Sequence, residues 1–526
     1  MDTRNIIALK YTESLNGAFR AVNPFTGLKL DGDFSQASDV QVNAALEQAS
    51  KAFQIFRSIS KDRKASFLRA IGEEILALGD TLIQRASEES GLSTVRLQGE
   101  RGRTVAQLNM FADQVEEGSW LEAILDSALP ERQPAPRVDL RRMLVPIGPI
   151  VVFGSSNFPL AFSVAGGDTA SAFAAGCPVV VKAHPAHPGT SALVGAAIVK
   201  AARKTEMPEG IFSLLYGNGN HIGESLVKHP AVKAVAFTGS FAGGMALSRL
   251  AYERAQPIPV FAEMSSINPV ILLPEALEER AEQIADEYAA SISLGVGQFC
   301  TNPGLLIAIE SPALDTFKSA LEKTILNSAS ATMLTESICN NYQSRSTTML
   351  EQEGVKVLAK SHKLNPEGKN QVAATIAEIT AQEFLQNNEL QEEVFGPWSL
   401  LVIAKSIEEI EQVLTSLGGQ LTVSVMSGSV GTKKYSSILG KATEIAGRVL
   451  MNGVPTGVEV CHAMQHGGPF PSTTDSRFTS VGATAVRRFV RPVCWQNWEH
   501  DLLPDELKDG NPLNIWRLKD KQWTKD

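Results

Sequence analysis

The stretch Ile150-Val151-Val152-Phe153-Gly154-Ser155-Ser156-Asn157 decides the fold, because an apolar run ends there in a glycine and small polar residues. Further apolar runs follow, separated by glycine- and alanine-rich segments. Uninterrupted apolar strands that alternate with helices are typical of a parallel sheet covered on both faces. They predict an α/β, doubly wound, Rossmann-like region, for which a nucleotide is the default ligand. The candidate strands are residues 150–153, 178–181, 212–215, 234–237, 260–262 and 270–272.

The chain on either side of this region predicts further helices and strands. Apolar residues at three- and four-residue spacing predict helices over 46–56 and 67–82, followed by a third helix that carries residues 101–111. After residue 264, a second α/β segment is expected. Its strands lie near 305–309, 400–404 and 421–426, and its helices near 313–327 and 407–416.

These features divide 526 residues, too many for one core, into three parts. We expect a cofactor-binding domain of residues 1–124 and 144–263 and an α/β catalytic domain of residues 264–465. Residues 125–143 are rich in proline and arginine, and residues 466–526 carry aromatic side chains that more often pack on a neighbour than dangle. We therefore expect these two segments to form a small oligomerisation element with a C-terminal tail, in a homodimer or homotetramer.

Composition and charge restrict the classes of partner. The chain has 57 acidic and 48 basic residues, a net charge of −9 and no basic block, so neither nucleic acid nor an anionic membrane is expected. The apolar run 143–153 is interrupted by Pro146, Gly148 and Pro149 and is too short to span a bilayer. No signal peptide is visible, and five scattered cysteines without a CxxC pair argue against disulfides and a cysteine zinc site. We expect a cytoplasmic protein without a metal ion.

One cysteine lies in a segment suited to chemistry, Gly295-Val296-Gly297-Gln298-Phe299-Cys300-Thr301-Asn302-Pro303-Gly304. The glycines allow the backbone to approach a ligand closely. Cys300 could act as a nucleophile if a neighbouring group lowered its pKa or removed its proton. A free cysteine is more often a small buried apolar residue, and without its surroundings that interpretation would be preferred.

Other candidate residues follow predicted strands, at the edge where open α/β sheets bind ligands. The Asn157 amide could donate to an oxyanion or could cap a helix. Phe237-Thr238-Gly239-Ser240 opens a helix whose backbone N–H groups suit a phosphate, although no GxGxxG motif is present and the glycines Gly217, Gly219 and Gly223 are too loosely spaced to count alone. Glu263 ends an apolar strand, which suits a general base of raised pKa, but a structural ion pair fits equally well.

Together these motifs resemble the aldehyde dehydrogenase superfamily, over roughly residues 20–505. The motifs that occur in the family's order and spacing are Asn157-Phe158-Pro159, Phe237-Thr238-Gly239-Ser240, Glu263, Gly297-Gln298-Phe299-Cys300 and Glu392-Glu393-Val394-Phe395-Gly396-Pro397. Residues 99–104, 182–190, 298–304 and 457–462 are more similar to its α-ketoglutaric semialdehyde (2,5-dioxovalerate) dehydrogenase branch.

The resemblance implies an aldehyde dehydrogenase fold and the oxidation of an aldehyde to a carboxylate through a cysteine thioester, with NADP or NAD as cofactor. Cys300 would be the nucleophile, Asn157 an oxyanion donor and Glu263 the base that activates water. The substrate would be α-ketoglutaric semialdehyde (2,5-dioxopentanoate), oxidised to 2-oxoglutarate. Cofactor-binding residues would be Phe153, Ser155, Lys182, His184, Pro185, Gly219, Gly223, Phe237, Gly239, Ser240, Glu393 and Phe395. Substrate-binding residues would be Arg103, Phe158, Gln298, Phe299 and Thr301.

Arg103 is the expected partner of the substrate's terminal carboxylate, because a desolvated carboxylate needs a cation, preferably the guanidinium fork. By the resemblance, the helix through residues 99–111 lines the substrate tunnel. Arg101 is the second choice, since it lies two residues away and points elsewhere on a helix. A solvated face or a subunit salt bridge explains Glu100, Arg101 and Arg103 equally well.

This chain departs from the family pattern at two positions. Many relatives read Glu-Leu-Gly-Gly-Lys where it has Glu263-Met264-Ser265-Ser266-Ile267, so the carboxylate is kept in an altered loop. Relatives that prefer NAD often carry a glutamate where this chain has Pro185, and its absence removes repulsion against the 2′-phosphate of NADP. Lys182 and His184 lie nearby as cations or donors, but NADP-using relatives often have an arginine in place of Asn220. The sequence therefore permits NADP and leans towards it without requiring it.

Several alternatives remain open from the sequence. Within the class, a broad or fatty aldehyde dehydrogenase is possible, whereas a CoA-acylating enzyme would not need Glu263. In another class, a Cys–His hydrolase could pair Cys300 with His462 or His466, although neither a nucleophile elbow nor a triad order supports it. A nonenzymatic relative would be expected to have lost Cys300 or Glu263.

Overall fold

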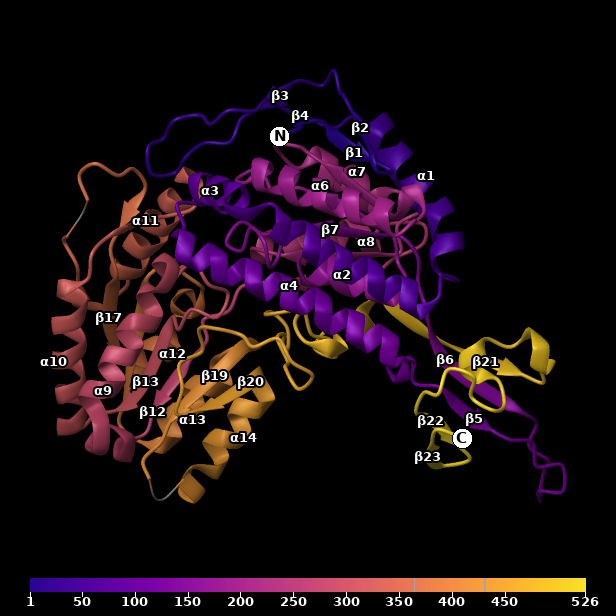
Figure 1. The fold of residues 1–526 in the computed structure, drawn as a ribbon. Helices are drawn as coiled ribbons and strands as arrows, with labels where there is room; N and C mark the ends of the chain where they lie inside the picture. The colour runs from indigo at the N-terminus through magenta and orange to yellow at the C-terminus, as the bar shows by residue number, and fades with distance from the viewer. Residues whose placement is uncertain (364, 430–431) are drawn as a thin grey trace.

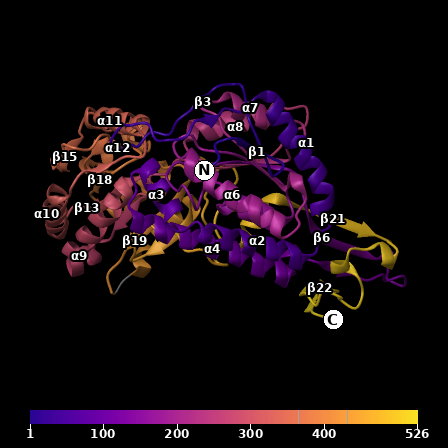
Figure 2. The same ribbon diagram turned by 45° about the horizontal axis from the view of Figure 1, so that its top comes forward.

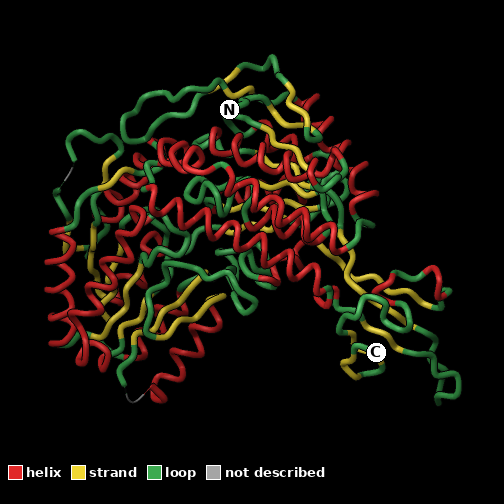
Figure 3. The backbone as a smooth tube through the Cα atoms, viewed as in Figure 1, coloured by secondary structure: helices red, strands yellow, loops and turns green. Residues whose placement is uncertain are grey.

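The computed structural model describes residues 1–363, 365–429 and 432–526. Two seven-stranded sheets, each packed between helices, form the body of the molecule, and a five-stranded sheet projects from it (Figures 1 and 2). Figure 3 shows helices enclosing the strands in the body and little helix around the projecting strands. No helix in the described ranges is long and apolar enough to cross a membrane.

The first sheet has the strand order β11-β10-β7-β8-β9-β1-β2. The strands from β11 to β9 are parallel, and β1 and β2 extend the sheet in antiparallel pairing from the edge of β9. The strands are β1 Asn5–Ile7, β2 Lys10–Thr12, β7 Ile150–Phe153, β8 Val179–Lys182, β9 Phe212–Leu215, β10 Ala234–Thr238 and β11 Val260–Glu263. The helices around it are α1 Asp39–Phe56, α2 Lys61–Ala77, α3 Gly79–Ser90, α4 Thr94–Glu117, α5 Gly167–Ala175, α6 Pro188–Lys204, α7 His221–Lys228 and α8 Phe241–Tyr252.

The side chains of these uninterrupted apolar strands pack into two hydrophobic cores, one on each face of the sheet. Val151 and Val180 pack on the face covered by α1, α7 and α8. Their neighbours Val152 and Val181 pack on the opposite face, under α2, α4, α5 and α6. Because successive side chains point to opposite faces, a strand covered on both sides is apolar at every position. The α/β, Rossmann-like fold class expected from the sequence is confirmed.

The sixth predicted strand, residues 270–272, belongs to the other sheet, so the sequence assignment was wrong at this point. This strand is β12 (Val270–Leu272), and it pairs with β13 (Leu305–Ile309) and β19 (Gln420–Met426). The strand order of the second sheet is β15-β17-β18-β13-β12-β19-β20. Between β11 and β12 the chain passes through Asn268, whose φ is 47°. An apolar run indicates a buried strand but does not identify the sheet that buries it.

The second sheet carries the segments predicted after residue 264. Its other strands are β13 Leu305–Ile309, β15 Lys356–Lys360, β17 Thr375–Thr380, β18 Trp398–Ala404, β19 Gln420–Met426 and β20 Ala446–Met451. Its helices are α9 Pro274–Ser293, α10 Pro312–Asn327, α11 Glu336–Leu350, α12 Ala381–Gln386, α13 Ile407–Ser416 and α14 Ser436–Ile445. Two short pairs, β3 Ala18–Phe19 with β4 Phe34–Ser35 and β14 Ala331–Thr332 with β16 Gln371–Val372, lie outside the large sheets.

The helix predicted over residues 67–82 is in fact two helices. α2 ends at Ala77 and α3 begins at Gly79, whose φ of +56° is left-handed and breaks the continuous turn. Apolar spacing continues across the break because both helices bury the same side, with Ile75 and Leu82 in one core. The third predicted helix is α4, capped by the Ser93 hydroxyl, which accepts from the Arg96 N–H.

The projecting sheet joins residues near 125–143 to the end of the chain, in the order β21-β6-β5-β22-β23. Its strands are β5 Ile124–Asp126, β6 Leu140–Pro146, β21 Val490–Gln496, β22 Arg517–Lys519 and β23 Gln522–Thr524, and the C-terminus lies within it (Figure 1). Residues 466–489 precede β21 in the chain. They run through the body of the molecule, where they contribute to the site described next.

Candidate active site

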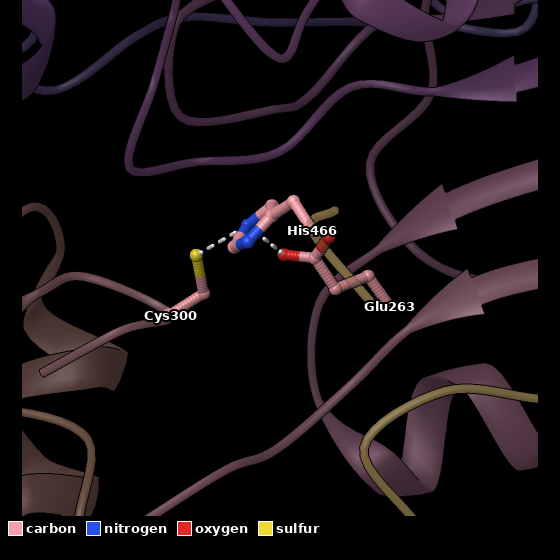
Figure 4. A group of neighbouring side chains, drawn as sticks. All are labelled: Glu263, Cys300 and His466. Carbon is pink, nitrogen blue, oxygen red and sulfur yellow. Dashed lines mark hydrogen bonds and ion pairs between the residues drawn. The ribbon is translucent and has the colours of Figure 1, made fainter. Parts of the chain in front are cut away.

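Glu263, Cys300 and His466 meet from three distant parts of the chain (Figure 4). Glu263 ends β11, Cys300 lies in the loop that precedes β13, and His466 lies beyond β20. The Cys300 Sγ is 3.3 Å from the His466 Nε2, and the same nitrogen is 3.0 Å from the Glu263 Oε1. A thiol, a carboxylate and an imidazole therefore meet at one point, where the carboxylate and the imidazole are buried.

His466 reaches this point because the following segment adds to the free edge of the first sheet. Thr473 forms an antiparallel bridge with Glu263, and the Met264 N–H donates to the Ser472 carbonyl at 2.8 Å. The chain then returns, so that the Ser480 N–H donates to the His466 carbonyl at 2.8 Å and the Ser480 hydroxyl donates to the Glu263 Oε2. His466 and Ser480 are thus fixed to the strand that carries Glu263.

Burial and charge set the ionisation of this group. Burial, followed by the neighbouring Glu263 carboxylate, raises the pKa of the Cys300 thiol well above its usual range. Burial acts to raise the pKa of Glu263 too, but His466 and the hydroxyl of Ser480 outweigh it, so the pKa of Glu263 is lowered overall. The prediction of a raised pKa for Glu263 is therefore wrong. The apolar strand sequence indicates that Glu263 is buried, but it does not indicate that His466 lies beside it.

The backbone of the cysteine loop is held in an unusual conformation. Gly295, Val296 and Gly297 have φ values of 55°, 61° and 63°, and a Cβ on Gly297 would lie 2.4 Å from the Gly396 carbonyl oxygen. Asn268 stabilises the loop by donating from its Nδ2 to the Cys300 carbonyl at 2.8 Å. The glycines therefore serve backbone geometry and close packing against the segment that carries Phe395.

Gln298, expected to contact the substrate, has its side chain engaged with the backbone instead. Its Nε2 donates to the Gly295 carbonyl at 3.2 Å, and its Oε1 accepts from the Leu334 N–H at 3.0 Å. Gln298 is fully buried and holds the cysteine loop in place. The sequence could not show this because Leu334 lies in a distant segment.

Asn157 lies beside the cysteine loop, as an oxyanion donor should. Its Nδ2 donates to the Gln298 carbonyl at 3.1 Å, and its own carbonyl accepts from the Arg96 Nη2 at 2.8 Å. An amide nitrogen carries two hydrogens, so one bond to Gln298 leaves a second donor. The structure thus places this amide next to the nucleophile rather than at a helix N-cap.

Two arginines on α4 lie against the aromatic residues near the cysteine. The Arg103 guanidinium carbon is 5.2 Å from the centroid of the Phe162 ring and 6.0 Å from that of Phe158. Its Nε and Nη2 are buried and have no hydrogen-bond partner in the described part of the chain. Arg96 lies 4.8 Å from the Phe299 ring. Arg96 was missed at the sequence level, although it shares a helix face with Arg103 at a spacing of seven.

The remaining charged residues of α4 have structural contacts. The Glu100 carboxylate accepts from the Leu160 N–H at 2.8 Å and the Ala161 N–H at 2.9 Å, so it caps the loop after Asn157. Arg101 points away and donates to the Gly79 carbonyl at 2.9 Å. The solvated face considered for this helix is therefore excluded for Glu100 and Arg103, both of which face the interior.

The residues expected to bind a cofactor lie near the carboxyl ends of β7, β8, β9 and β10. The Ser240 hydroxyl caps α8 by accepting from the Gly243 N–H. The first turn of that helix is exposed to solvent. A Cβ on Gly239 or Gly243 would come within 3.0 Å of the Phe237 ring, so a larger residue at either position would displace that ring. The other residues at this edge are Phe153, Ser155, Lys182, His184, Pro185, Gly219 and Gly223.

Lys182 and His184 differ in charge. Burial lowers the pKa of Lys182 to about 8, so the side chain is still largely protonated at neutral pH. Burial lowers the pKa of His184 well below its usual value, and its Nδ1 accepts from the Ala186 N–H at 3.1 Å. Of the two roles considered for His184, cation or donor, the lowered pKa leaves the donor, and the charge at this position comes from Lys182.

A small hollow lies beside the cysteine loop, lined by Ser266, Gly297, Asn302, Glu393 and Phe395 among others. Burial raises the pKa of Glu393 to about 7, against the hydrogen bonds from the Ser265 hydroxyl and the Ser266 N–H. Ser265 and Ser266 are two of the residues at which this loop departs from the family pattern, and both act to lower the pKa of this carboxylate. Thr301 is buried within the loop, and the Phe299 ring packs edge-on against Phe158 at 5.2 Å.

Comparison with known proteins agrees with this arrangement. The chain is 51% identical over 505 residues to alpha-ketoglutaric semialdehyde dehydrogenase 2 of Azospirillum brasilense, covering 96% of each chain. It is 47% identical over 486 residues to alpha-ketoglutaric semialdehyde dehydrogenase of Acinetobacter baylyi, covering 92% of each.

Solved structures share the fold. A 1-pyrroline-5-carboxylate dehydrogenase from Thermus with bound NAD superimposes with a TM-score of 0.79 at 20% identity, over 94% of this chain and 92% of the other. Betaine aldehyde dehydrogenase from Staphylococcus aureus gives a TM-score of 0.80 at 18% identity, over 95% and 96%. The profile of the aldehyde dehydrogenase family matches residues 11–490. The chain therefore belongs to the aldehyde dehydrogenase family.

Proposed function

We propose that this protein oxidises α-ketoglutaric semialdehyde to 2-oxoglutarate with NAD or NADP. Family membership supports the dehydrogenase chemistry, and the names of the two relatives at 51% and 47% identity support the substrate. The observation that carries the proposal is Arg103, whose unpaired Nε and Nη2 are buried among aromatic rings near the nucleophile. Guanidinium nitrogens that are buried without a hydrogen-bond partner among the described residues suit a substrate that brings its own carboxylate.

The first chemical step belongs to Cys300. Its sulfur attacks the aldehyde carbon, and the thiol proton passes to the coupled His466–Glu263 pair, which lies within hydrogen-bonding distance. A thiol whose pKa is raised needs such an acceptor. The Asn157 amide and the Cys300 N–H stabilise the oxyanion of the thiohemiacetal, and one such donor is typically worth about 3 kcal/mol.

The second half of the reaction returns the enzyme to its starting state. When bound, the nicotinamide ring supplies a hydride acceptor, and the product on Cys300 is a thioester. The His466–Glu263 pair releases the thiol proton to solvent, and the ionised Glu263 then takes a proton from water, which attacks the thioester carbon. The carbon–sulfur bond breaks, 2-oxoglutarate leaves, and Cys300 regains a proton.

The cofactor edge of the first sheet fits a dinucleotide. The exposed first turn of α8 offers backbone N–H groups to a phosphate, and the glycines around Phe237 allow close approach. Lys182 would hold a ribose hydroxyl, and Glu393 with Phe395 would hold the ribose next to the nicotinamide. A lean towards NADP rests on Pro185 and the charge of Lys182, and the neutral His184 weakens it.

The alternatives weighed from the sequence can be compared with the site. The contact that a Cys–His hydrolase would need is present between Cys300 and His466, whereas His462 is exposed. The family match does not favour the hydrolase. The buried Arg103 speaks against a fatty aldehyde, whose apolar chain would leave the guanidinium unpaired.

The domain boundaries and the homo-oligomer also stay proposals. The projecting sheet carries exposed apolar side chains, with Trp498 50%, Leu502 63% and Trp523 63% exposed. Apolar side chains gathered on a projecting element suit contact with another subunit. Light scattering on the intact chain tests this, and a monomer at working concentration would refute it.

The function is tested by mixing the protein with an aldehyde and NAD or NADP and following the absorbance of the reduced nicotinamide. We expect α-ketoglutaric semialdehyde to have a higher kcat/KM than an uncharged aldehyde such as hexanal, and Cys300→Ala to abolish the signal while the fold and cofactor binding persist. Robust turnover by the alanine variant, or equal kcat/KM for both aldehydes, would contradict the proposal.

A further inference from the structure

The meeting point of Glu263, Cys300 and His466 has the composition of a metal site as well as of a catalytic one. A thiol sulfur, an imidazole nitrogen and a carboxylate oxygen lie within 4.8 Å of one another (Figure 4). These are the donor types that zinc binds in proteins. The members of the set are 37 and 166 residues apart and form no ligand motif, so the three could not be grouped as metal ligands from the sequence.

We propose that these three side chains bind one thiophilic divalent cation of the zinc class, and that binding of the cation and turnover of an aldehyde exclude each other. The cation would take the Cys300 sulfur, the His466 Nε2 and one Glu263 oxygen, and solvent would hold the fourth position. Three protein ligands with one open position is the pattern of an accessible zinc site rather than of a closed structural one.

The distances agree with a tetrahedral ion after small movements. Zinc bonds of about 2.3 Å to sulfur and about 2.1 Å to nitrogen or oxygen place tetrahedral ligands about 3.4–3.6 Å apart. The sulfur–nitrogen and nitrogen–oxygen separations are 3.3 Å and 3.0 Å. Each of these two pairs needs to separate by only a few tenths of an ångström, while the sulfur and the carboxylate oxygen, which lie within 4.8 Å of each other, have to settle at about 3.6 Å to admit the ion.

Charge favours a dication at this point. A thiolate and the Glu263 carboxylate supply two negative charges, which a divalent cation neutralises, and the proton of the Cys300 thiol is released to solvent on binding. The Ser480 hydroxyl donates to Glu263 and orients it in the way that outer partners orient metal ligands. The site is also protected, because Glu263 and His466 are buried.

The second ring nitrogen of His466 lowers the expected affinity for zinc below that of a structural zinc site. The Nδ1 of His466 is buried and has no hydrogen-bond partner among the described residues. A metal-bound histidine usually donates from its second nitrogen, and losing such a partner typically costs about 10–100-fold in affinity. We therefore infer a reversible, inhibitory site and not a resident metal.

The consequence for catalysis follows from the ligand set. Cys300 cannot attack a carbonyl carbon while its sulfur is bound to a cation, and Glu263 cannot accept a proton from water while its oxygen is bound. The inference concerns binding by the free protein and does not depend on which aldehyde the enzyme oxidises.

Zinc alone is titrated by calorimetry into the metal-free, full-length protein, without aldehyde or cofactor. We expect one ion per chain. Cadmium, used in a parallel titration, should produce the ultraviolet charge-transfer absorption of a cadmium thiolate. Cys300→Ser should remove that absorption, and His466→Phe and Glu263→Gln should each weaken zinc binding about tenfold or more. His466→Gln gives a second test of the imidazole if the phenylalanine variant does not fold.

Cys494→Ser is the matched control, because Cys494 is an exposed thiol outside the cluster. It should bind zinc as the unaltered protein does. The proposal is overturned if the unaltered protein binds no zinc, if Cys300→Ser keeps the cadmium absorption, or if the Cys494 variant loses it. Dehydrogenase activity is measured separately in the absence of metal, so a failure of the proposed function and a failure of the metal site give different results.

Discussion

The Nε2 atom of His466 is shared by two partners, the sulfur of Cys300 at 3.3 Å and the Oε1 of Glu263 at 3.0 Å. A ring nitrogen carries either one proton or one lone pair, so it cannot donate to the carboxylate and accept from the thiol at the same time. The proton must therefore be redistributed when Cys300 reacts. This sharing connects the two halves of the reaction, since acylation uses the thiol and hydrolysis uses the carboxylate.

Glu263→Gln should separate acylation of Cys300 from hydrolysis of the thioester. The amide can still accept a hydrogen bond but cannot take a proton from water, so hydrolysis of the thioester fails first. We expect a rapid burst of reduced cofactor followed by very slow turnover in stopped-flow measurements. Normal steady-state turnover without a burst would show that Glu263 has another role.

His466→Phe should slow the burst itself. The phenyl ring fills the place of the imidazole but removes the hydrogen bond to the thiol and the ion-pair contact with the carboxylate. We expect the burst rate to fall by about 10²-fold or more, the scale of losing a proton-transfer partner. Retention of cofactor affinity in the variant would show that the site remains folded. An unchanged burst rate would mean that His466 has only a packing role against Phe162.

Arg103→Met should change substrate choice. Loss of a charged partner for a buried carboxylate is expected to reduce kcat/KM for α-ketoglutaric semialdehyde by about 2–4 kcal/mol of transition-state stabilisation, roughly 30- to 700-fold. Hexanal, which lacks the carboxylate, should be nearly unaffected. Arg101→Met is the control on the same helix, because the Arg101 guanidinium donates to the Gly79 carbonyl. Equal losses on both aldehydes would assign Arg103 to structure.

Cofactor binding should weaken in acid because of Glu393. Its pKa is raised to about 7, so the carboxylate is ionised above that pH and protonated below it. Only the ionised form accepts two hydrogen bonds from ribose hydroxyls, and cofactor affinity should fall by up to about tenfold for each pH unit below 7. In Glu393→Gln this slope should disappear, as measured by fluorescence titration of the cofactor. A slope that persists in the variant would place the titrating group elsewhere.

Pro185→Glu should move the enzyme towards NAD. A carboxylate at this position would repel the 2′-phosphate of NADP and could accept from the ribose hydroxyls of NAD. The Michaelis constant for NADP should rise more than that for NAD. If the unaltered enzyme already prefers NAD by orders of magnitude, the lean towards NADP is wrong.

Local sequence patterns were sufficient to predict the parallel strands β7 to β11 and to single out Cys300 as the candidate nucleophile. The apolar runs of β7 to β11 could be predicted because burial on both faces leaves no polar position, and Cys300 could be identified because its glycines and the family motifs surround it. The Arg103 prediction depended on the family resemblance, and helical spacing made Arg101 the second choice; in the structure two nitrogens of Arg103 are buried without a partner among the described residues, whereas Arg101 donates to the Gly79 carbonyl.

What could not be predicted depends on contacts between distant segments. The lowered pKa of Glu263 comes from His466, which the sequence singled out only as the partner in a different class of enzyme. Gln298 is held by Leu334, and β12 pairs in a sheet that its own residues do not specify. Each of these relations joins residues that are close only after the chain has folded.

The pairing of residues 472–474 with β11 has a mechanical consequence. It attaches the segment that bears His466 to the same strand as Glu263, whereas Cys300 is carried by the loop that leads into the second sheet. A relative displacement of the two sheets would lengthen or shorten the gap between sulfur and imidazole and leave the imidazole–carboxylate pair intact. Closure of the molecule around its ligands would thereby adjust one distance of the reaction, the one across which the thiol proton travels.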